Sequence, residues 1–166
     1  MCLECDGYSF EQVMLDLDLT IRTFGWQLTQ VSDPAPISTL PWSYTIGLGE
    51  SYDHAELMMI GVELGTQSMV IRRVVSMIEE RGQIDHDELA RLGLSLVEVH
   101  RNHLRDHWFG RWSHRYGEPP PDGTFLQIVP PSDWFCECHQ HSVPRFDRPA
   151  PIRFGNRAER RRQRRR

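Results

Sequence analysis

Two short segments near opposite ends of the chain contain all four of its cysteines. The first is Cys2-Leu3-Glu4-Cys5-Asp6-Gly7, and the second is Phe135-Cys136-Glu137-Cys138-His139-Gln140-His141. A Cys-x-x-Cys pair that runs into glycine has the form of a metal knuckle, and Cys136 to His139 repeats this spacing with an imidazole as the second ligand. A shared metal ion would join positions about 130 residues apart, so this feature restricts the fold by requiring the two segments to meet.

The donor atoms favour zinc. We expect Zn²⁺ to be held by Cys2, Cys5, Cys136 and His139, with Cys138 and His141 as alternative or outer donors. Four sulfur and nitrogen ligands complete a tetrahedron and leave no position for water, which indicates a structural site. Two other interpretations stay open, namely four free thiols and a redox Cys-x-x-Cys, although a redox motif normally begins a helix in a βαβ unit.

Length and composition are those of a single globular domain. The chain has 166 residues, of which 39% are apolar and 25% charged, which is enough to bury a core. We expect residues 1–150 to form that domain and residues 151–166 to form a basic, disordered tail. Neither a signal-peptide pattern nor an apolar run of the roughly 20 residues that span a bilayer is present. The sequence therefore predicts a cytoplasmic protein without a membrane partner, where cysteines at this spacing favour metal over disulfides.

The net charge of −4 hides an acidic body and a basic tail. Residues 156–166 contain seven Arg and one Glu, whereas residues 1–155 carry a net charge of −10, and no lysine occurs anywhere. Guanidinium groups pair well with phosphate, although codon bias also explains the absence of lysine. The tail predicts sequence-independent contact with nucleic acid or another anion; docking on an acidic surface and added solubility are the alternatives. The tail arginines concerned are Arg160, Arg161, Arg162, Arg164, Arg165 and Arg166.

Local signals predict the first helix. Ser9 and Gln12 have the spacing of a capping box, and Gly25 stands where a glycine ends a helix, so a helix is expected over residues 10–24. One face of this helix is apolar and is predicted to be core. It consists of Phe10, Val13, Met14, Leu17, Ile21 and Phe24. Leu15 and Leu19 fall on the opposite face, where they are either a small contact surface or two isolated exposed side chains.

The remaining patterns predict an α+β fold. Strands are expected over residues 26–31, 41–48, 56–62, 94–99 and 124–129, and helices over residues 66–81 and 102–116. The second and third strands should form a hairpin, because a turn-like segment over Gly49–His54 is too short for a parallel crossover. Residues 84–92 have no clear pattern. We expect a mainly antiparallel sheet of about five strands, two to three packed helices, and termini joined by the Cys/His metal site.

A family resemblance rests on four parts of the sequence. Gly25-Trp26, Trp42-Ser43-Tyr44-Thr45-Ile46-Gly47-Leu48, His54-Ala55-Glu56-Leu57 and Gly61 together resemble the bacterial domain-of-unknown-function family numbered four-two-six-two. Its usual pattern is a Y-T-[IV]-G-L strand followed by H-P-E-L and a glycine, and its actinobacterial members share the N-terminal C-x-x-C-D-G and the arginine-rich end. The resemblance covers about residues 8–130. Ala55 stands where the family has proline, which implies a looser turn. The family implies no established activity.

One candidate for acid–base chemistry lies in the same segments. Tyr44, Thr45, His54 and Glu56 would supply a hydroxyl, an imidazole and a carboxylate at the ends of neighbouring strands. Alternation along the strand places Tyr44 and Thr45 on opposite faces, so the four groups cannot all converge. The alternative interpretation is that His54 or Glu56 satisfies backbone groups at the turn.

A second candidate is a set of histidines on the predicted helix over residues 102–116. His100, His103, His107 and His114 would share one side of a helix that begins near residue 100, where they would bind metal or an anion or respond to pH near 6.5. The alternative is a solvated helix face. The neighbouring arginines and tryptophans would stack on nucleic-acid bases, although the acidic body opposes this interpretation.

These observations favour a binding or regulatory module over an enzyme. A zinc-stabilised domain that binds a protein partner, of the immunity or adaptor kind, is the first hypothesis. The second is a metal-assisted hydrolase that uses His54 and Glu56, or the His100–His114 set. The third is a nucleic-acid-binding protein that uses the arginine tail. Motifs for nucleotide binding, serine hydrolysis and zinc-dependent proteolysis are absent.

Overall fold

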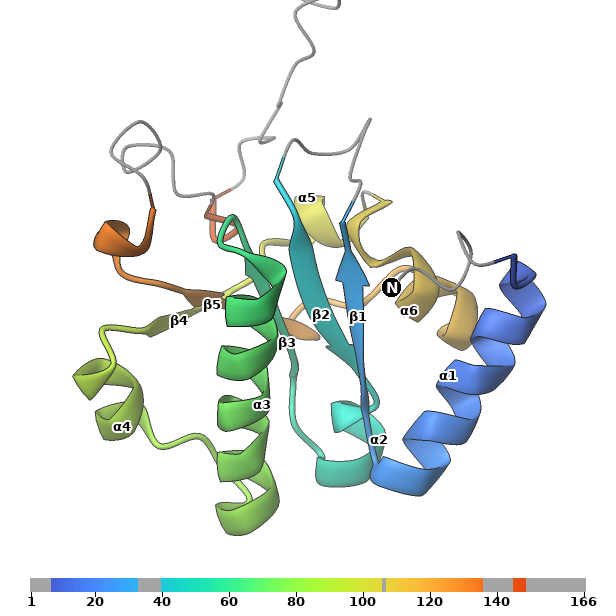
Figure 1. Ribbon diagram of the computed structural model, residues 1–166, viewed down its shortest axis with the longest axis horizontal. Helices are drawn as coiled ribbons and strands as arrows, with labels where there is room; N and C mark the ends of the chain where they lie inside the picture. Colours follow the sequence, from blue (N-terminus) through green and yellow to red (C-terminus); the bar gives the residue numbers. More distant parts are fainter. Residues whose placement is uncertain (1–6, 33–39, 106, 136–144, 149–166) are drawn as a thin grey trace, which may run out of the picture.

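A five-stranded mixed sheet lies at the centre of the computed structural model, which describes residues 7–32, 40–105, 107–135 and 145–148 (Figure 1). Its strands are β1 (Gln27–Val31), β2 (Trp42–Ile46), β3 (Glu56–Ile60), β4 (Ser95–Glu98) and β5 (Phe125–Val129), in the order β1-β2-β3-β5-β4. All neighbouring pairs are antiparallel except β3 and β5, which are parallel. The predicted α+β class and mostly antiparallel sheet are confirmed. The predicted metal site lies outside the described residues.

Helices cover both faces of the sheet. They are α1 (Phe10–Phe24), α2 (Leu48–Tyr52), α3 (Leu64–Arg81), α4 (His86–Arg91), α5 (Arg101–Leu104) and α6 (Gly110–Tyr116), with 3₁₀ turns at His107–Phe109 and Ser132–Trp134. One buried cluster joins the sheet to α1, α5 and α6, and a second joins it to α3 and α4. Figure 1 shows α3 in front of the sheet and α2 below it, at the end where β2 finishes.

Helix α1 begins and ends where its local signals predict. Gln12 N–H donates to Ser9 Oγ at 3.2 Å, and the Gln12 side chain accepts from Ser9 N–H at 2.8 Å, while Gly25 ends the helix with a φ of 84°. The expectation that Phe10 and Phe24 are core residues is wrong, because they are 42% and 68% exposed. A helix of this length spans about 22 Å, whereas a five-residue strand spans only about 17 Å, so the terminal turns extend past the sheet.

Helix α3 confirms its predicted buried face. Its buried apolar side chains are Val70, Ile71, Val74, Val75, Met77 and Ile78. Gly82 ends the helix in the left-handed region, as expected. Two arginines of the opposite face form ion pairs with the region of α4: Arg73 pairs with Glu88, and Arg81 Nη1 lies 2.6 Å from Asp85 Oδ2. The segment with no clear pattern thus contains a short helix that packs through Leu89, which is 2% exposed.

The connection between β2 and β3 contains α2 where a simple turn is expected over Gly49–His54. Its first turn follows Gly47, whose φ is 111°, and it ends at Asp53, the described non-glycine residue with a positive φ of 51°. The hairpin pairing of β2 with β3 is confirmed. The five-residue helix is too short to be stable alone, so its contacts with the sheet and with α1 hold it in place.

The single helix predicted over residues 102–116 is wrong, because the chain forms α5, a 3₁₀ turn and α6 instead. Side chains of β2 bind backbone groups that this break releases. Trp42 Nε1–H donates to the carbonyl of Trp108 at 3.1 Å, and Arg111 N–H donates to the hydroxyl of Tyr44 at 3.3 Å. The break brings both Trp108 and Phe109 into the core, where they are 4% and 0% exposed.

Candidate functional site

Residues from three of the four segments that carry the family resemblance meet at one end of the sheet, where β2 finishes and β3 and β5 begin, whereas Gly61 follows the other end of β3. Thr45 Oγ1–H donates to Glu56 Oε2 at 2.6 Å, and Gly47 N–H donates to Glu56 Oε1 at 2.8 Å. The backbone N–H of Leu57 in turn donates to Thr45 Oγ1 at 2.9 Å. Side chains of Thr45 and Glu56 thus replace ladder hydrogen bonds at the point where the two strands separate.

Glu56 is a buried carboxyl group with neutral hydrogen-bond donors around it. Glu56 is only 2% exposed. Burial raises the pKa of Glu56, and the hydrogen bonds from Thr45 and from the backbone of Gly47 partly offset this shift. Both oxygens accept hydrogen bonds, so Glu56 satisfies backbone and hydroxyl donors, as the second interpretation of this segment expected.

His54 lies next to Glu56 but does not bond to it. Its Nδ1 is 2.7 Å from the carbonyl oxygen of Ala55. Since a carbonyl only accepts, Nδ1 is the donor in this contact. His54 lines two separate cavities, described below, and so stands between them.

Tyr44 lies apart from these groups in the core. It is 2% exposed and contacts the rings of Phe109 and Phe125 edge to face. Burial raises its pKa to about 12, so the phenol stays protonated. Of the four acid–base candidates, the structure brings Thr45, His54 and Glu56 to the same end of the sheet and places Tyr44 in the core with Ile46.

Two glycines allow α1 and α2 to approach this end of the sheet closely. A Cβ on Gly47 would lie 2.8 Å from the carbonyl oxygen of Gly25, and a Cβ on Gly25 would lie 2.9 Å from the hydroxyl oxygen of Tyr52. Ser51 Oγ–H donates to the same Gly25 carbonyl at 2.6 Å. Glu79 of α3 accepts from Trp26 Nε1–H at 3.1 Å and from the Tyr52 hydroxyl at 3.2 Å. Gly47 therefore lies where the backbones of two elements approach closely.

The first cavity, which we call the sheet-end cavity, has a volume of about 290 Å³. Its walls come from α2, the start of β3, α6 and the segment before β5. The lining residues are Gly49, Glu50, His54, Ala55, Glu56, Trp112, Tyr116, Pro121 and Thr124. The Trp112 and Tyr116 rings form one wall, with their centroids 4.4 Å apart, and the carboxyl groups of Glu50 and Glu56 are its acidic members.

An ion-pair network fixes Glu50 at the edge of this cavity. Arg115 Nη2 donates to both carboxylate oxygens of Glu50, at 3.0 and 3.1 Å, and the Tyr116 hydroxyl donates to Oε1 of the same carboxylate. Arg115 also pairs with Asp18 of α1. Burial, followed by the hydrogen bond to Glu50, raises the pKa of Tyr116 to about 12, so the phenol remains a donor.

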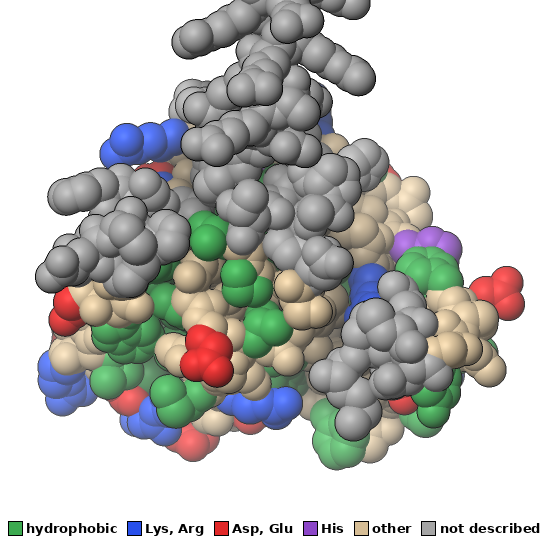
Figure 2. All heavy atoms as spheres, turned by 45° about the horizontal axis from the view of Figure 1, so that its top comes forward, with side chains coloured by type: hydrophobic (Ala, Val, Ile, Leu, Met, Phe, Trp, Pro, Cys, Tyr) green, Lys and Arg blue, Asp and Glu red, His purple; other side chains and the backbone are tan. Residues whose placement is uncertain are grey.

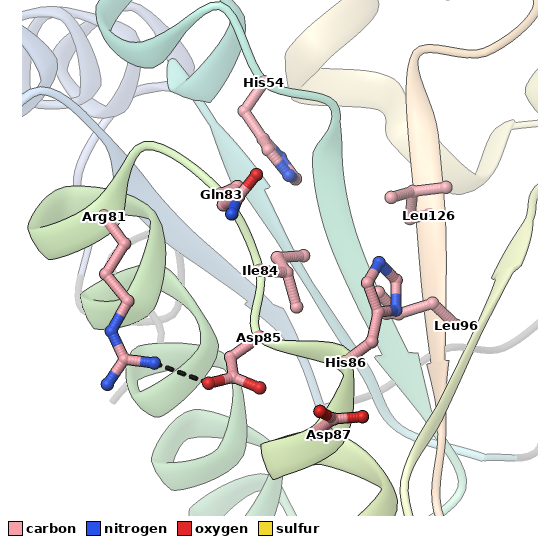
Figure 3. A pocket seen from close by; sticks show the side chains of 9 residues that line it. All are labelled: His54, Arg81, Gln83, Ile84, Asp85, His86, Asp87, Leu96 and Leu126. Atoms are coloured by element: carbon pink, nitrogen blue, oxygen red, sulfur yellow. Dashed lines mark hydrogen bonds and ion pairs between the residues drawn. The ribbon is translucent and has the colours of Figure 1, made fainter.

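The second cavity, the α3–β4 groove, lies on the other side of His54 and has a volume of about 450 Å³ (Figure 3). His54 and Gln83 lie at one end of the view, and His86 lies beside Leu96. The Arg81 guanidinium turns aside to Asp85. The groove therefore presents two imidazoles together with a charge pair that is already neutralised.

The face that Figure 2 shows presents a mixed surface. Figure 2 shows hydrophobic, Arg and Asp or Glu side chains interspersed over the described part of this face, with no continuous area of either charge. The predicted anion contact uses Arg160, Arg161, Arg162, Arg164, Arg165 and Arg166, which lie outside the described residues. It therefore stays a prediction.

The predicted histidine set is divided among separate elements. His100 caps α5 by accepting from Asn102 N–H at 3.3 Å. His103 is 1% exposed, packs on the Phe146 ring and has Nε2 3.1 Å from the carbonyl of Arg148. His107 belongs to the 3₁₀ turn, and His114 of α6 contacts the Phe10 ring. The premise that one helix presents all four imidazoles is wrong.

Metal ligation by the cysteine segments remains a prediction. Cys2, Cys5, Cys136, Cys138, His139 and His141 all lie outside the described residues. Within the described ranges, no group of three or more His, Cys, Asp or Glu side chains has an arrangement that could hold a metal ion. His54 and Glu56 thus do not form a metal site with a third described ligand.

A comparison with known families identifies the region that contains this site. The family described as "Domain of unknown function (DUF4262)" matches residues 20–133, more than half of the 166-residue chain. The chain belongs to this family. The DUF4262 region runs from the second half of α1 to the turn after β5, so it contains the whole sheet and both cavities. No curated protein and no solved structure matches the chain.

Two further findings concern the site and the helices of this DUF4262 domain. Sequence patterns contain no signal that Glu50 and Arg115 would meet at the sheet end, because that contact crosses 65 positions of the chain. Within the described residues, no helix has both the length and the apolar character that crossing a bilayer requires.

Proposed function

We propose that this DUF4262 domain is a binding or regulatory module whose partner or ligand occupies the sheet-end cavity. The observation that carries the proposal is the composition of that cavity. Its lining combines an aromatic pair, Trp112 and Tyr116, with two acidic residues, Glu50 and Glu56. A concave site with apolar walls and a few oriented polar groups is suited to recognition.

The contacts of Glu56, an acid–base candidate, and of Glu50, which the structure adds to the cavity, support binding over catalysis. Glu56 uses both oxygens to hold Thr45 and Gly47, and Glu50 uses both oxygens to hold Arg115. A general base needs an accessible lone pair and a pKa near the operating pH. The hydrolase alternative is left with His54, whose Nδ1 is engaged with the Ala55 carbonyl oxygen at 2.7 Å.

The test of this function compares the full chain with two variants in a pull-down from an extract of the source organism. Tyr116→Leu removes an aromatic ring from the cavity wall. Met69→Ala is the control, because it changes a side chain of α3 that is 64% exposed. We expect a component that the wild type and Met69→Ala retain and that Tyr116→Leu loses. The affinity of that component, purified, should fall at least about tenfold in Tyr116→Leu, as for loss of an interface anchor.

The hydrolase alternative is examined with the same proteins. Generic carboxylic-ester, phosphodiester and peptide substrates should show no turnover above the buffer. Sustained turnover that His54→Ala abolishes would establish the enzyme in place of the module. Equal retention of every extract component by the wild type and Tyr116→Leu would remove the cavity from the proposal.

The zinc-stabilised part of the proposal rests on the sequence alone. Cys2, Cys5, Cys136 and His139 supply a donor set that suits structural zinc. Purified full chain should contain one zinc ion per molecule by elemental analysis, and Cys5→Ser should lose it. Because a metal that joins distant segments restricts the unfolded chain, Cys136→Ser should also melt at a markedly lower temperature. Absence of zinc, or unchanged melting, would contradict this part.

A further inference from the structure

We propose that the pocket around Phe146 is a peptide-binding site, which the chain's own residues 145–148 occupy and thereby close to other peptides. We call residues 145–148 the anchor segment. When this segment is released, the ligand is a short segment of another protein with a phenylalanine side chain as its anchor. The described residues that contact Phe146, which define the Phe146 pocket, are His100, His103, Trp108 and Gln127. None of these four residues lines the sheet-end cavity, so the inference goes beyond the proposed function.

The ring of Phe146 fills the pocket. Phe146 is 0% exposed. Its ring centroid lies 4.6 Å from that of His103 and 4.9 Å from that of Trp108, which it contacts edge to face. Arg145 and Arg148 are exposed and Asp147 is half-buried. One large apolar side chain therefore enters the core while its neighbours stay outside, which is how a short peptide inserts an anchor residue into a domain.

Main-chain groups of the anchor segment are bound at the same place. Phe146 N–H donates to Gln127 Oε1 at 2.8 Å, and the Phe146 carbonyl accepts from His100 N–H at 2.7 Å. The carbonyl oxygen of Arg148 lies 3.1 Å from His103 Nε2. In peptide recognition such main-chain hydrogen bonds provide affinity, and a side-chain pocket provides specificity. The Phe146 pocket combines both.

The charges of the anchor segment pair with each other. Arg145 Nη2 lies 2.8 Å from Asp147 Oδ2, and the two side chains are 40% and 28% exposed. This ion pair is internal to the segment, so it does not attach the segment to the domain. The chemistry that the pocket recognises is therefore an aromatic side chain together with its main-chain groups, and not a charge.

The pocket and its occupant belong to different parts of the chain. The four pocket residues lie within residues 20–133, which the DUF4262 family matches, whereas the anchor segment lies beyond that range. The anchor segment forms neither a helix nor a strand. It is thus a short peptide that the chain itself supplies to a pocket of the family domain. A tethered ligand has an effective concentration in the millimolar range, so it excludes a competing peptide until it is released.

The experiment measures the binding of a fluorescein-labelled peptide to the full chain by fluorescence anisotropy. The probe is Pro-Arg-Phe-Asp-Arg-Pro, the sequence of residues 144–149, with blocked ends, and a peptide with alanine in place of phenylalanine is its control. Phe146→Ala vacates the pocket and should bind the probe with a Kd on the order of 100 μM, since the ligand is short and flexible. The wild type should bind it at least about tenfold more weakly, because its own segment competes. The control peptide should bind neither protein.

Arg145→Ala is the matched control, because it changes an exposed side chain of the anchor segment and leaves the anchor in place. It should bind the probe as weakly as the wild type. The probe should also raise the melting temperature of Phe146→Ala and leave that of the wild type unchanged. Circular dichroism shows whether each variant is folded. A folded Phe146→Ala that does not bind the probe, or equal binding of the probe and the control peptide, would overturn the proposal.

Hydrogen exchange of the wild-type chain tests release of the anchor segment without any substitution. The amide of Phe146 should exchange at least about a hundredfold faster than that of Met58 in the central strand β3, because a short segment opens locally and a core strand opens only when the domain unfolds. Equal exchange of the two amides would show that Phe146 is a permanent part of the core and would overturn the proposal. This measurement decides the question by itself if Phe146→Ala does not fold.

Analytical ultracentrifugation distinguishes the source of the ligand. We expect the wild type to be monomeric, as an occupant from the same chain requires. A wild-type dimer that Phe146→Ala abolishes would show that the anchor segment fills the pocket of a second copy, and it would overturn the assignment to another protein. The extract experiment with Tyr116→Leu tests the sheet-end cavity alone, so failure of either proposal leaves the other standing.

Discussion

Replacing Glu56 by alanine is expected to lower the free energy of unfolding by about 2–4 kcal/mol. The change removes the acceptors of Gly47 N–H and Thr45 Oγ1–H, which are 2.8 and 2.6 Å from the carboxylate oxygens. Each buried donor without a partner costs about 1–3 kcal/mol, and water from the adjacent cavity recovers part of that loss. Denaturant unfolding followed by circular dichroism measures the difference.

Glutamine at position 56 is the matched control. Its amide oxygen can accept from Gly47 N–H, and its amide nitrogen can donate to Thr45 Oγ1, so the main contacts are retained without the charge. Glu56→Gln should therefore remain within about 1 kcal/mol of the wild type at pH 7. A loss as large as that of Glu56→Ala would mean that the charge, and not the hydrogen bonds, holds this end of the sheet.

The pH dependence of stability separates the same two effects. Burial raises the pKa of Glu56 in the folded state, so above the unfolded value of about 4.3 the folded protein binds more protons than the unfolded one. The contribution of Glu56 is therefore fully present below that value and is lost as pH rises through the folded pKa. Glu56→Gln removes this loss, so its stability relative to the wild type should increase with pH.

Elements with strong local signals could be predicted from the sequence, and α1 is the clearest example. Its capping box at Ser9 and its terminal Gly25 involve residues within a few positions of one another, and periodic apolar residues lie between them. The same holds for α3 and for the β2–β3 pair. These signals need no knowledge of the rest of the fold.

Elements that depend on distant contacts could not be predicted. The helix break before α6 is stabilised by Trp42 and Tyr44, which contact residues 66 and 67 positions further along the chain. The parallel β3–β5 pair and the Glu50–Arg115 contact are likewise long-range. The acidic partners of the aromatic wall could not be predicted either, because no pattern links Glu50 and Glu56 to α6.

The candidate acid–base group illustrates the same limit. Alternation along β2 correctly separates Tyr44 from Thr45, which is a property of any strand. That Thr45 and Glu56 bond to each other depends on how β2 and β3 diverge beyond their last paired residues, Tyr44 and Met58. Thr45, Gly47 and Glu56, which belong to the segments that carry the family resemblance, thus form one hydrogen-bonded end of the sheet, a relation that the spacing alone does not contain.

Replacing Gly47 by alanine is expected to lower the free energy of unfolding by about 3–5 kcal/mol. Two causes add: the φ of 111° is unfavourable for a residue with a side chain, and the new Cβ would lie 2.8 Å from the Gly25 carbonyl oxygen. The carbonyl is backbone and is held by Ser51, so the contact is relieved only if α1 and α2 separate. The melting temperature should fall by about 10 °C.

Gly82→Ala is the matched control for the backbone conformation. Its φ of 70° is also positive, but a Cβ there meets no atom within 4 Å, so the variant should lose only the left-handed strain of about 1–2 kcal/mol. The excess loss in Gly47→Ala measures the approach of α1 to α2. Because Gly47 also donates to Glu56, that separation would disturb the sheet-end cavity, whereas Gly82→Ala would leave it intact. Equal losses in the two variants would show that the close approach contributes nothing.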